Sequence, residues 1–196
     1  MSTAFFDLLQ AQRGHFRYES GYHGEIWLDL DALLLKPRAL APFVRELASR
    51  LARNDVEAVV GPFAGGAFIA QMIATEIGAL FAYAEPQQST NDGLYSVAYR
   101  LPGTIAPLLK GKRVAIVDDV VNAGSALRGT FKTLIEAGAQ PVVVGALLTL
   151  GETAAPFIKD NGMAFEHLAT LANPLWAPSD CPHCARGIPL GPFDRA

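Results

Sequence analysis

One stretch of the sequence indicates the fold, RVAIVDDVVNAGSALRGT at residues 113–130. An apolar run leads to two adjacent carboxylates, Asp118 and Asp119, and a turn of small residues follows. This order predicts a buried strand over 114–118 and, after the turn, a helix over 126–136. Successive backbone N–H groups beside a helix N-terminus form a favourable place for an anion, so the turn is a candidate anion site.

The residue types in this stretch point to one kind of ligand. Gly124 lets the backbone come close to a bound group, and Ser125 adds a hydroxyl donor. Adjacent carboxylates accept hydrogen bonds from a vicinal diol, so the stretch predicts a ribose 5-phosphate site. The alternative is an ordinary strand–turn–helix junction, which explains Ser125 as an N-cap but not two acids that end an apolar strand. A P-loop is excluded because no Gly-Lys-Ser/Thr follows.

Strands and helices alternate on both sides of this stretch. Strands are predicted over 56–60, 80–84, 142–148 and 164–167, and helices over 38–53, 68–77 and 154–159. Such alternation is typical of an α/β domain with a central parallel sheet flanked by helices. Ligands of these sheets bind beyond the carboxyl ends of the strands, and the polar residues 86–94 form a candidate loop at that edge.

The N-terminal part of the chain does not show this alternation of strands and helices. A short helix is expected over 4–13, closed by Gly14. Two short strands, 16–18 and 25–29, then flank a turn at Ser20-Gly21.

The amino-acid composition indicates a globular domain. The 196 residues include 51% hydrophobic and 18% charged residues, which is enough apolar material for one domain with a large core. The net charge of −3 excludes a general attraction to nucleic acid or to an anionic membrane.

Residues 58–75 carry no charge, but Gly61-Pro62 and Gly65-Gly66 interrupt them, so a strand, a glycine loop and a helix are expected rather than a membrane span. The start shows no signal peptide, and we expect a cytoplasmic protein.

The 118–128 segment resembles the phosphoribosyl pyrophosphate (PRPP) motif of type I phosphoribosyltransferases, and it looks closest to that of orotate phosphoribosyltransferases. The resemblance implies that Asp118 and Asp119 hold the ribose hydroxyls and that residues 122–126 wrap the 5-phosphate. Arg128 matches the family arginine that reaches the base, and a guanidinium offers two parallel donors for a carboxylate or an imide edge. The implied PRPP-binding residues are Asp118, Asp119, Val120, Val121, Asn122, Ala123, Gly124, Ser125 and Ala126.

Two further segments carry the resemblance. Gly61, Pro62, Phe63, Ala64, Gly65 and Gly66 are similar to the family's pyrophosphate loop, although a plain strand–helix turn would read the same. Residues 14–36 resemble the family's N-terminal segment and imply a small hood over the site. Trp27 then falls where the family places an aromatic residue against the base, and its alternative role is to pack the hood onto the core.

The sequence also departs from the family pattern. Glu19 stands where the family has a lysine, and residues 85–93 lack the basic residues of the family's catalytic loop. The nearest cation is Arg100, which we assign as catalytic together with Asp118 and Asp119. Departure of pyrophosphate needs positive charge. Either Mg²⁺ and Arg100 supply more of it, or turnover is slow, or the substrate differs.

The resemblance implies a type I phosphoribosyltransferase fold, a single domain over residues 1–196 with a sheet of about five strands. The implied reaction transfers ribose 5-phosphate from PRPP to orotate, giving orotidine 5′-monophosphate and pyrophosphate. Mg²⁺ is implied as the cofactor, held through PRPP with no protein ligand assigned, and a homodimer is implied with residues 86–94 near the partner's site. Two alternatives remain: another base, favoured by Glu19, and a non-catalytic PRPP- or nucleotide-binding regulatory domain, favoured by the missing loop cations.

The tail over 178–196 contains the two cysteines of the chain, Cys181 and Cys184. Two thiolates at this spacing can contribute to a zinc site, but four ligands are needed and a dimer would have to pool two halves. A redox pair and a structural turn with reduced thiols are the other interpretations. His15, His23 and His167 lie far apart in sequence, and no metal site is predicted from them.

Overall fold

A computed structural model describes residues 5, 8–29, 33–87 and 94–192 of the chain, and its centre is a six-stranded sheet in the order β5-β4-β3-β6-β7-β8. The strands are β3 (Ala58–Pro62), β4 (Leu80–Gln87), β5 (Ala98–Arg100), β6 (Arg113–Val121), β7 (Gln140–Leu150) and β8 (Ala164–Leu171). Five of them are parallel, and β5 pairs antiparallel with the end of β4. The predicted parallel sheet is confirmed, with β5 as an additional edge strand.

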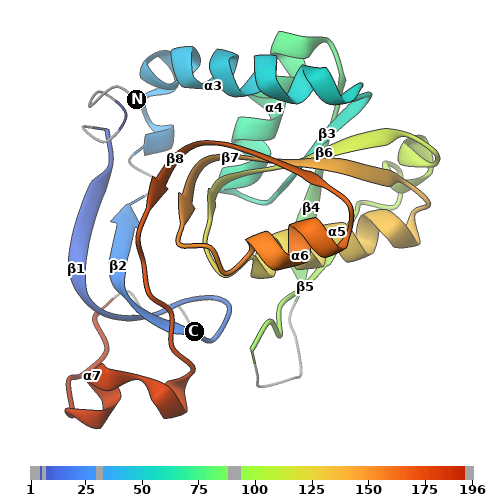
Figure 1. Ribbon diagram of the computed structural model, residues 1–196. Helices are drawn as coiled ribbons and strands as arrows, with labels where there is room; N and C mark the ends of the chain where they lie inside the picture. Colours follow the sequence, from blue (N-terminus) through green and yellow to red (C-terminus); the bar gives the residue numbers. More distant parts are fainter. Residues whose placement is uncertain (1–4, 6–7, 30–32, 88–93, 193–196) are drawn as a thin grey trace.

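Helices cover both faces of this sheet (Figure 1). Helices α3 (Pro37–Leu51) and α4 (Gly65–Ile77) pack on one face, and α5 (Ser125–Glu136) and α6 (Ala155–Asp160) on the other. Short 3₁₀ turns lie at Ala52–Asn54, Ala106–Leu109 and Pro178–Asp180, and a last helical turn is α7 (Pro182–Ala185). No helix in the described part of the chain is long and apolar enough to cross a membrane.

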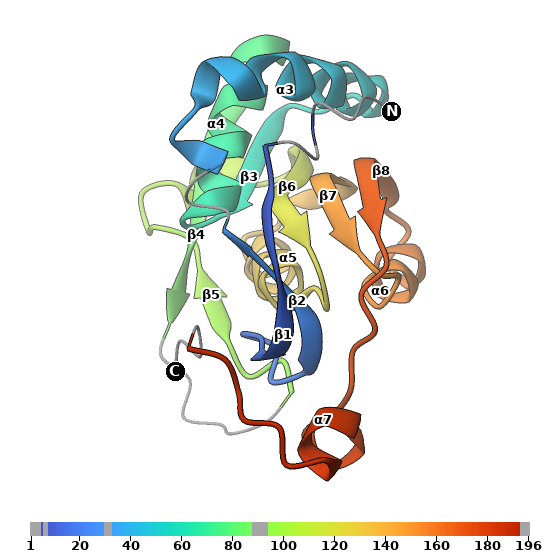
Figure 2. The ribbon, with the colours of Figure 1, turned by 90° about the vertical axis from the view of Figure 1, so that its left-hand side faces the viewer.

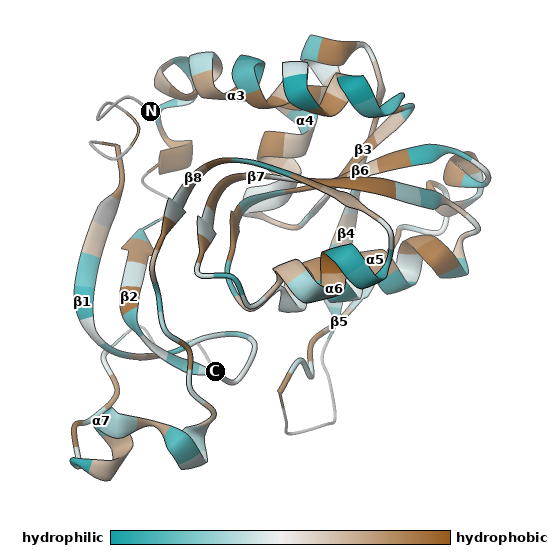
Figure 3. Cartoon of the chain, viewed as in Figure 1, coloured by the Kyte–Doolittle hydropathy of each residue, from teal (hydrophilic) through white to brown (hydrophobic). Residues whose placement is uncertain are grey.

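The sheet is apolar because it is covered on both faces. Strand β7 is buried from Val143 to its end at Leu150, as expected for a central parallel strand, and its apolar run is visible in Figure 3. Helix α3 approaches this strand closely, since a Cβ on Gly145 would lie 2.9 Å from Leu51. Helix α4 ends at Gly78, whose φ of 72° is the left-handed conformation of a helix C-cap. The uncharged residues 58–75 are therefore β3, a loop and most of α4, as predicted.

The hood is an antiparallel pair of strands, β1 (Gln10–Arg17) and β2 (His23–Asp29), which lies across the carboxyl ends of the sheet strands (Figure 2). The predicted helix over 4–13 is wrong, because residues 10–13 pair with residues 29–26 of β2. Pairing with β2 overrides the local helix propensity of Gln, Ala and Arg. Gly14 ends no helix but lies in the irregular step of β1 between Arg13 and Phe16.

The C-terminal tail is fastened to the hood. Beyond β8 the backbone of Trp176 exchanges two hydrogen bonds with that of His23, at 2.9 and 3.0 Å. The N–H of Gly191 donates to the carbonyl of His15 at 2.7 Å, and α7 lies beside the hood in Figure 2. Parts of the segments predicted from the sequence, namely 4, 6–7, 30–32, 88–93 and 193–196, lie outside the described residues.

Candidate active site

The main cavity, of about 800 Å³, lies between the hood and the carboxyl ends of β3 and β6. Segments far apart in the sequence meet around it. The lining consists of residues 17–20 and 26–29 of the hood, 62–66 from the end of β3 to the start of α4, and 118–127 from the end of β6 to the start of α5, with Gln12, Leu35, Tyr99 and Leu150. The whole predicted pyrophosphate loop except Gly61, and all of the predicted PRPP-binding residues, therefore face one space.

The N-terminus of α5 opens into this cavity. The helix begins after Gly124, whose φ of 82° lies in the left-handed region, where glycine is favoured. No described side chain caps the helix, so its first N–H groups are left for a ligand. The hydroxyl of Ser125 donates to Oε1 of Glu19 at 3.1 Å.

A second helix N-terminus faces the same cavity. Helix α4 begins at Gly65, directly after the 62–64 turn, and it too has no cap among the described side chains. Its glycines are needed for space, because a Cβ on Gly66 would lie 2.6 Å from Oδ1 of Asp118 and one on Gly65 would overlap the carboxylate of Asp119. Two anion sites of this kind on one cavity, with a carboxylate pair beside them, fit a ligand with two separate phosphate groups.

The carboxylate pair ends the apolar part of β6. Asp119 is 7% exposed, and its Oδ1 accepts a hydrogen bond from the N–H of Val120 at 2.8 Å. The N–H of Asp119 donates to Oδ1 of Asp118 at 3.1 Å. Burial, followed by the neighbouring charges of Asp119 and Glu19, raises the pKa of Asp118 well above its usual range. A cation or a set of hydroxyl donors at this place would relieve that repulsion.

Glu19, which stands at the family's lysine position, points its carboxylate into the cavity. Its Oε1 accepts a hydrogen bond from Tyr99 at 3.2 Å in addition to that from Ser125. Burial raises the pKa of Tyr99, and the charges of Glu19 and Asp118 raise it further. Among the described lining residues the charged groups are four carboxylates and one guanidinium, those of Glu19, Asp29, Asp118, Asp119 and Arg17. The lining of the cavity is thus rich in carboxyl groups.

The structure does not bring all of the predicted site residues to the cavity. Trp27 lines it, with its ring 5.9 Å from that of Phe16. Arg128 lies outside the lining, with its guanidinium over the rings of Tyr95 and Phe157 at 4.6 and 4.2 Å. Its Nε is buried and has no hydrogen-bond partner among the described residues.

The other predicted cation also lies away from the lining. Arg100 is 62% exposed and pairs with Glu85 at 2.9 Å across the β4–β5 ladder. To play the roles predicted for them, Arg100 and Arg128 would have to turn their side chains towards the cavity, or a bound ligand would have to move towards them.

Arg17, Tyr18 and Tyr99 are among the lining residues that the sequence analysis did not assign to the site. Arg17 and Tyr18 come from the hood, and Tyr99 from the three-residue strand β5. Strand β5 has three residues and is too short to show a periodic pattern, so periodicity gives no signal for Tyr99. Gly129 is a partial signal, because a Cβ at that point of α5 would collide with the Tyr99 ring.

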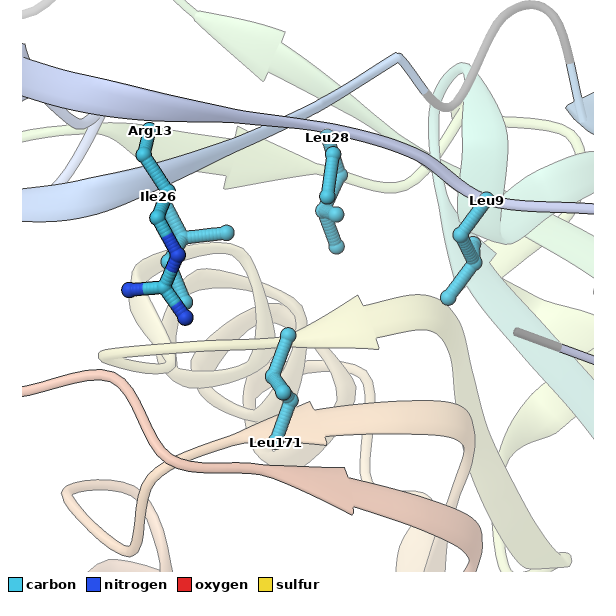
Figure 4. A pocket seen from close by; sticks show the side chains of 6 residues that line it. Leu9, Arg13, Ile26, Leu28 and Leu171 are labelled. Carbon is cyan, nitrogen blue, oxygen red and sulfur yellow. The ribbon is translucent and has the colours of Figure 1, made fainter. Parts of the chain in front are cut away.

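A second hollow, of about 240 Å³, lies between the hood and the end of β8 (Figure 4). Its lining is apolar apart from one guanidinium, and consists of Leu9, Ala11, Arg13, Ile26, Leu28 and Leu171. None of these described lining residues is a catalytic acid, base or nucleophile, so we assign the chemistry to the main cavity.

The tail cysteines meet two of the histidines from which no metal site was predicted. His15 and His23 lie with Cys181 and Cys184 at the contact of hood and tail, with their ligand atoms within 4.8 Å of one another. His167 lies elsewhere, in β8, with its ring 4.8 Å from that of Phe165. Distance along the chain was a poor guide here, because β1 and β2 are antiparallel and the tail returns to them.

The family model of the phosphoribosyl transferase domain matches residues 33–164, which include both helix N-termini and the carboxylate pair. The chain belongs to this family of enzymes. Two of its relatives are the orotate phosphoribosyltransferases of Thermotoga maritima and Thermus thermophilus. The first is 32% identical over 90% of this chain and 87% of its own length, and the second is 32% identical over 90% of each.

Solved phosphoribosyltransferase structures share the fold. The orotate phosphoribosyltransferase from Aeropyrum pernix matches with a TM-score of 0.65 and 23% identity, over 87% of this chain and 94% of that one. The adenine phosphoribosyltransferase from Leishmania donovani matches with a TM-score of 0.67 and 17% identity, over 87% and 80%. The predicted type I phosphoribosyltransferase fold is confirmed.

Proposed function

We propose that this phosphoribosyltransferase transfers ribose 5-phosphate from PRPP to orotate, releasing pyrophosphate and giving orotidine 5′-monophosphate. One observation carries the PRPP part of the proposal: the N-termini of α4 and α5, both without a side-chain cap in the described chain, open on one cavity beside Asp118 and Asp119. PRPP has the matching groups, a 5-phosphate and a pyrophosphate on either side of a ribose diol.

The residues would act by position and charge. The turn at 122–126 would hold the 5-phosphate through backbone N–H groups, and the carboxylates of Asp118 and Asp119 would accept the ribose hydroxyls. The first N–H groups of α4 would face the departing pyrophosphate. Positive charge develops on the ribose ring during the transfer, and the nearby carboxylates would stabilise it, so no covalent nucleophile is needed.

The cavity fits the use of Mg²⁺ with PRPP. Its described lining has one guanidinium against four carboxylates, so a ligand with many negative charges needs a counter-charge that the protein does not supply. Carboxylate and phosphate oxygens are the hard donors that Mg²⁺ prefers, and the bound ion would neutralise the pyrophosphate. Asp118 and Asp119 would contact it through the ribose hydroxyls or directly. We expect PRPP binding to depend strictly on a divalent cation.

The choice of orotate rests on the two relatives described above, both named orotate phosphoribosyltransferase, and on the planar side chain of Trp27 in the lining. A second candidate is a base without a carboxylate. It is favoured by the carboxylate of Glu19 in the cavity and by Arg128 outside the lining. A base with exposed amino donors would suit Glu19 better than the orotate anion.

The experiment is pyrophosphate release from PRPP and Mg²⁺ with a panel of orotate, uracil, adenine, guanine and hypoxanthine. Release that depends on orotate, with orotidine 5′-monophosphate as product, is the expected result. Release with another base alone would establish the second candidate. PRPP binding without release for any base in the panel would favour the non-catalytic alternative and contradict the proposal.

A further inference from the structure

The contact of hood and tail contains a cluster of four metal-binding side chains away from the main cavity. His15 and His23 come from the two strands of the hood, Cys181 is the N-cap of α7, and Cys184 lies within that helix. His15, His23 and Cys181 are buried at 3%, 6% and 2% exposure, and both cysteines are free thiols. None of the four lines the main cavity.

Three nitrogen–sulfur distances within the cluster match those of a tetrahedral site. His15 Nε2 lies 3.4 Å from Cys181 Sγ and 3.7 Å from Cys184 Sγ, and His23 Nδ1 lies 3.3 Å from Cys184 Sγ. Bonds of about 2.0–2.1 Å to nitrogen and about 2.3 Å to sulfur place tetrahedral zinc ligands roughly 3.3–3.8 Å apart. The two ring nitrogens, at 2.9 Å, are slightly closer and need only a small ring rotation.

The surroundings orient His15 for this task. Its Nδ1 is 2.8 Å from the carbonyl of Ile188, so Nδ1 carries the proton and donates, and Nε2 presents its lone pair to the cluster. A ligand histidine commonly has its other nitrogen bonded to a carbonyl in this way. The ring of His183 stacks on His15 at 5.2 Å, and its Nε2 contacts Glu25 at 3.0 Å, so that histidine is occupied outside the cluster.

We propose that His15, His23, Cys181 and Cys184 bind one zinc ion within a single chain. Two thiolates and two neutral imidazoles form a neutral complex with Zn²⁺, which suits a mostly buried place. All four positions are taken by protein ligands, so the ion has a structural role and no open position for a substrate. The spacing Cys-x-x-Cys is usual for zinc, and the partner histidines come from the hood rather than from a second subunit.

The site would connect the tail to the hood turn that enters the main cavity. His15 and His23 bracket residues 17–20, which line the cavity and include Glu19. The backbone bonds from Trp176 to His23 and from Gly191 to His15 already bring hood and tail together. Bound zinc would add four strong bonds to this contact, because metal binding stabilises the folded state that forms the site. The inference does not depend on the identity of the base or on turnover.

The test measures metal directly. The full-length protein is produced with zinc in the medium, kept reduced and analysed for zinc per chain, with one ion per chain expected. The metal-free protein is then titrated with Co²⁺, which reports the same site by absorption. We expect the visible bands of tetrahedral cobalt and a thiolate-to-cobalt charge-transfer band that saturate at one equivalent. Half an ion per chain, or no thiolate band in the reduced wild-type protein, would overturn the proposal.

Variants locate the site. Cys184→Ser alters the exposed thiol, and it is expected to lower zinc occupancy severely and to reduce the charge-transfer band to about half, since one of two thiolates remains. His23→Gln should likewise lose zinc, whereas His167→Gln, in β8 outside the cluster, should keep one ion per chain. Undiminished zinc in Cys184→Ser and His23→Gln would refute the site. The cobalt titration of the wild-type chain needs no variant and decides the question if a variant fails to fold.

Discussion

Asp118 and Asp119 share the main cavity with Glu19, and this proximity has a consequence for stability. Burial and the two neighbouring carboxylates raise the pKa of Asp118 in the folded protein above its value in the unfolded chain. Between those two values the folded state binds more protons than the unfolded state, so stability falls as the pH rises through that range. The pair is therefore arranged for binding, at a cost to the stability of the ligand-free protein.

We accordingly predict that Asp118→Asn stabilises the ligand-free protein at alkaline pH, because the variant has no charge to bury. The difference in Tm between variant and wild type should grow from acid to alkaline pH, as measured by thermal unfolding across a pH series. Asp160→Asn, at the exposed end of α6, is the matched control and should show no such growth. If the Tm of the wild type instead rose relative to that of Asp118→Asn as the pH increased, the raised pKa of Asp118 would be contradicted.

A second residue-scale prediction concerns Arg128. If its guanidinium turns from the rings of Tyr95 and Phe157 to read the base, Arg128→Ala should raise the KM for the base and leave that for PRPP nearly unchanged. Loss of a charged hydrogen bond costs about 1.5–3 kcal/mol, or roughly ten- to a hundredfold. Lys132→Ala, on the exposed side of the same helix, is the control. An equal effect on both substrates, or none, would remove Arg128 from base recognition.

At the scale of elements, the loop from β3 to α4 depends on the closeness of its glycines to the carboxylates. Gly65→Ala would push the carboxylate of Asp119 aside without removing it, and we predict at least a tenfold loss of PRPP affinity, about 1.4 kcal/mol. Calorimetric titration with PRPP and Mg²⁺ measures it. Gly103→Ala, where a new Cβ meets nothing within 4 Å, should bind as the wild type does. Equal affinity in both variants would show that this close approach is not needed.

The elements also show how far the sequence could be interpreted. The β6–turn–α5 unit was predictable because a buried parallel strand, a small-residue turn and an amphipathic helix each leave a local pattern. Strand β1 was not, since residues 10–13 have helix-forming side chains and become a strand only by pairing with β2. The His–Cys cluster was missed for the same reason. Its members meet through the hairpin and the returning tail, and neither contact leaves a periodic signal.

At the scale of the whole molecule, an exposed aromatic patch supports the predicted homodimer. Phe63, Phe68, Phe81 and Tyr83 form a chain of ring contacts at 6.0–6.3 Å beside α4, and Phe63 and Phe68 are 51% and 49% exposed. We call these four residues the aromatic patch. Since Phe63 also lines the main cavity, a second chain on the patch would lie next to the site.

We predict that the wild-type protein is a dimer and that Phe68→Glu is a folded monomer, because a charge within the aromatic patch opposes its burial. Light scattering at micromolar concentration gives the mass. Ile135→Glu, 51% exposed on α5 at the opposite face of the sheet, should remain dimeric. A monomeric wild-type protein, or dissociation by Ile135→Glu alone, would place the interface elsewhere or remove it.

The binding of PRPP by the main cavity is tested most directly by calorimetric titration with PRPP and Mg²⁺. The wild-type protein is compared with the Asp118→Asn/Asp119→Asn double variant, and thermal unfolding verifies that the variant is folded. Both carboxylates face the cavity rather than the cores on either side of the sheet, so we predict a folded variant whose affinity falls by more than tenfold, since each lost charged hydrogen bond costs about 1.5–3 kcal/mol. Undiminished PRPP affinity in the folded double variant would contradict the ribose-binding role of this pair.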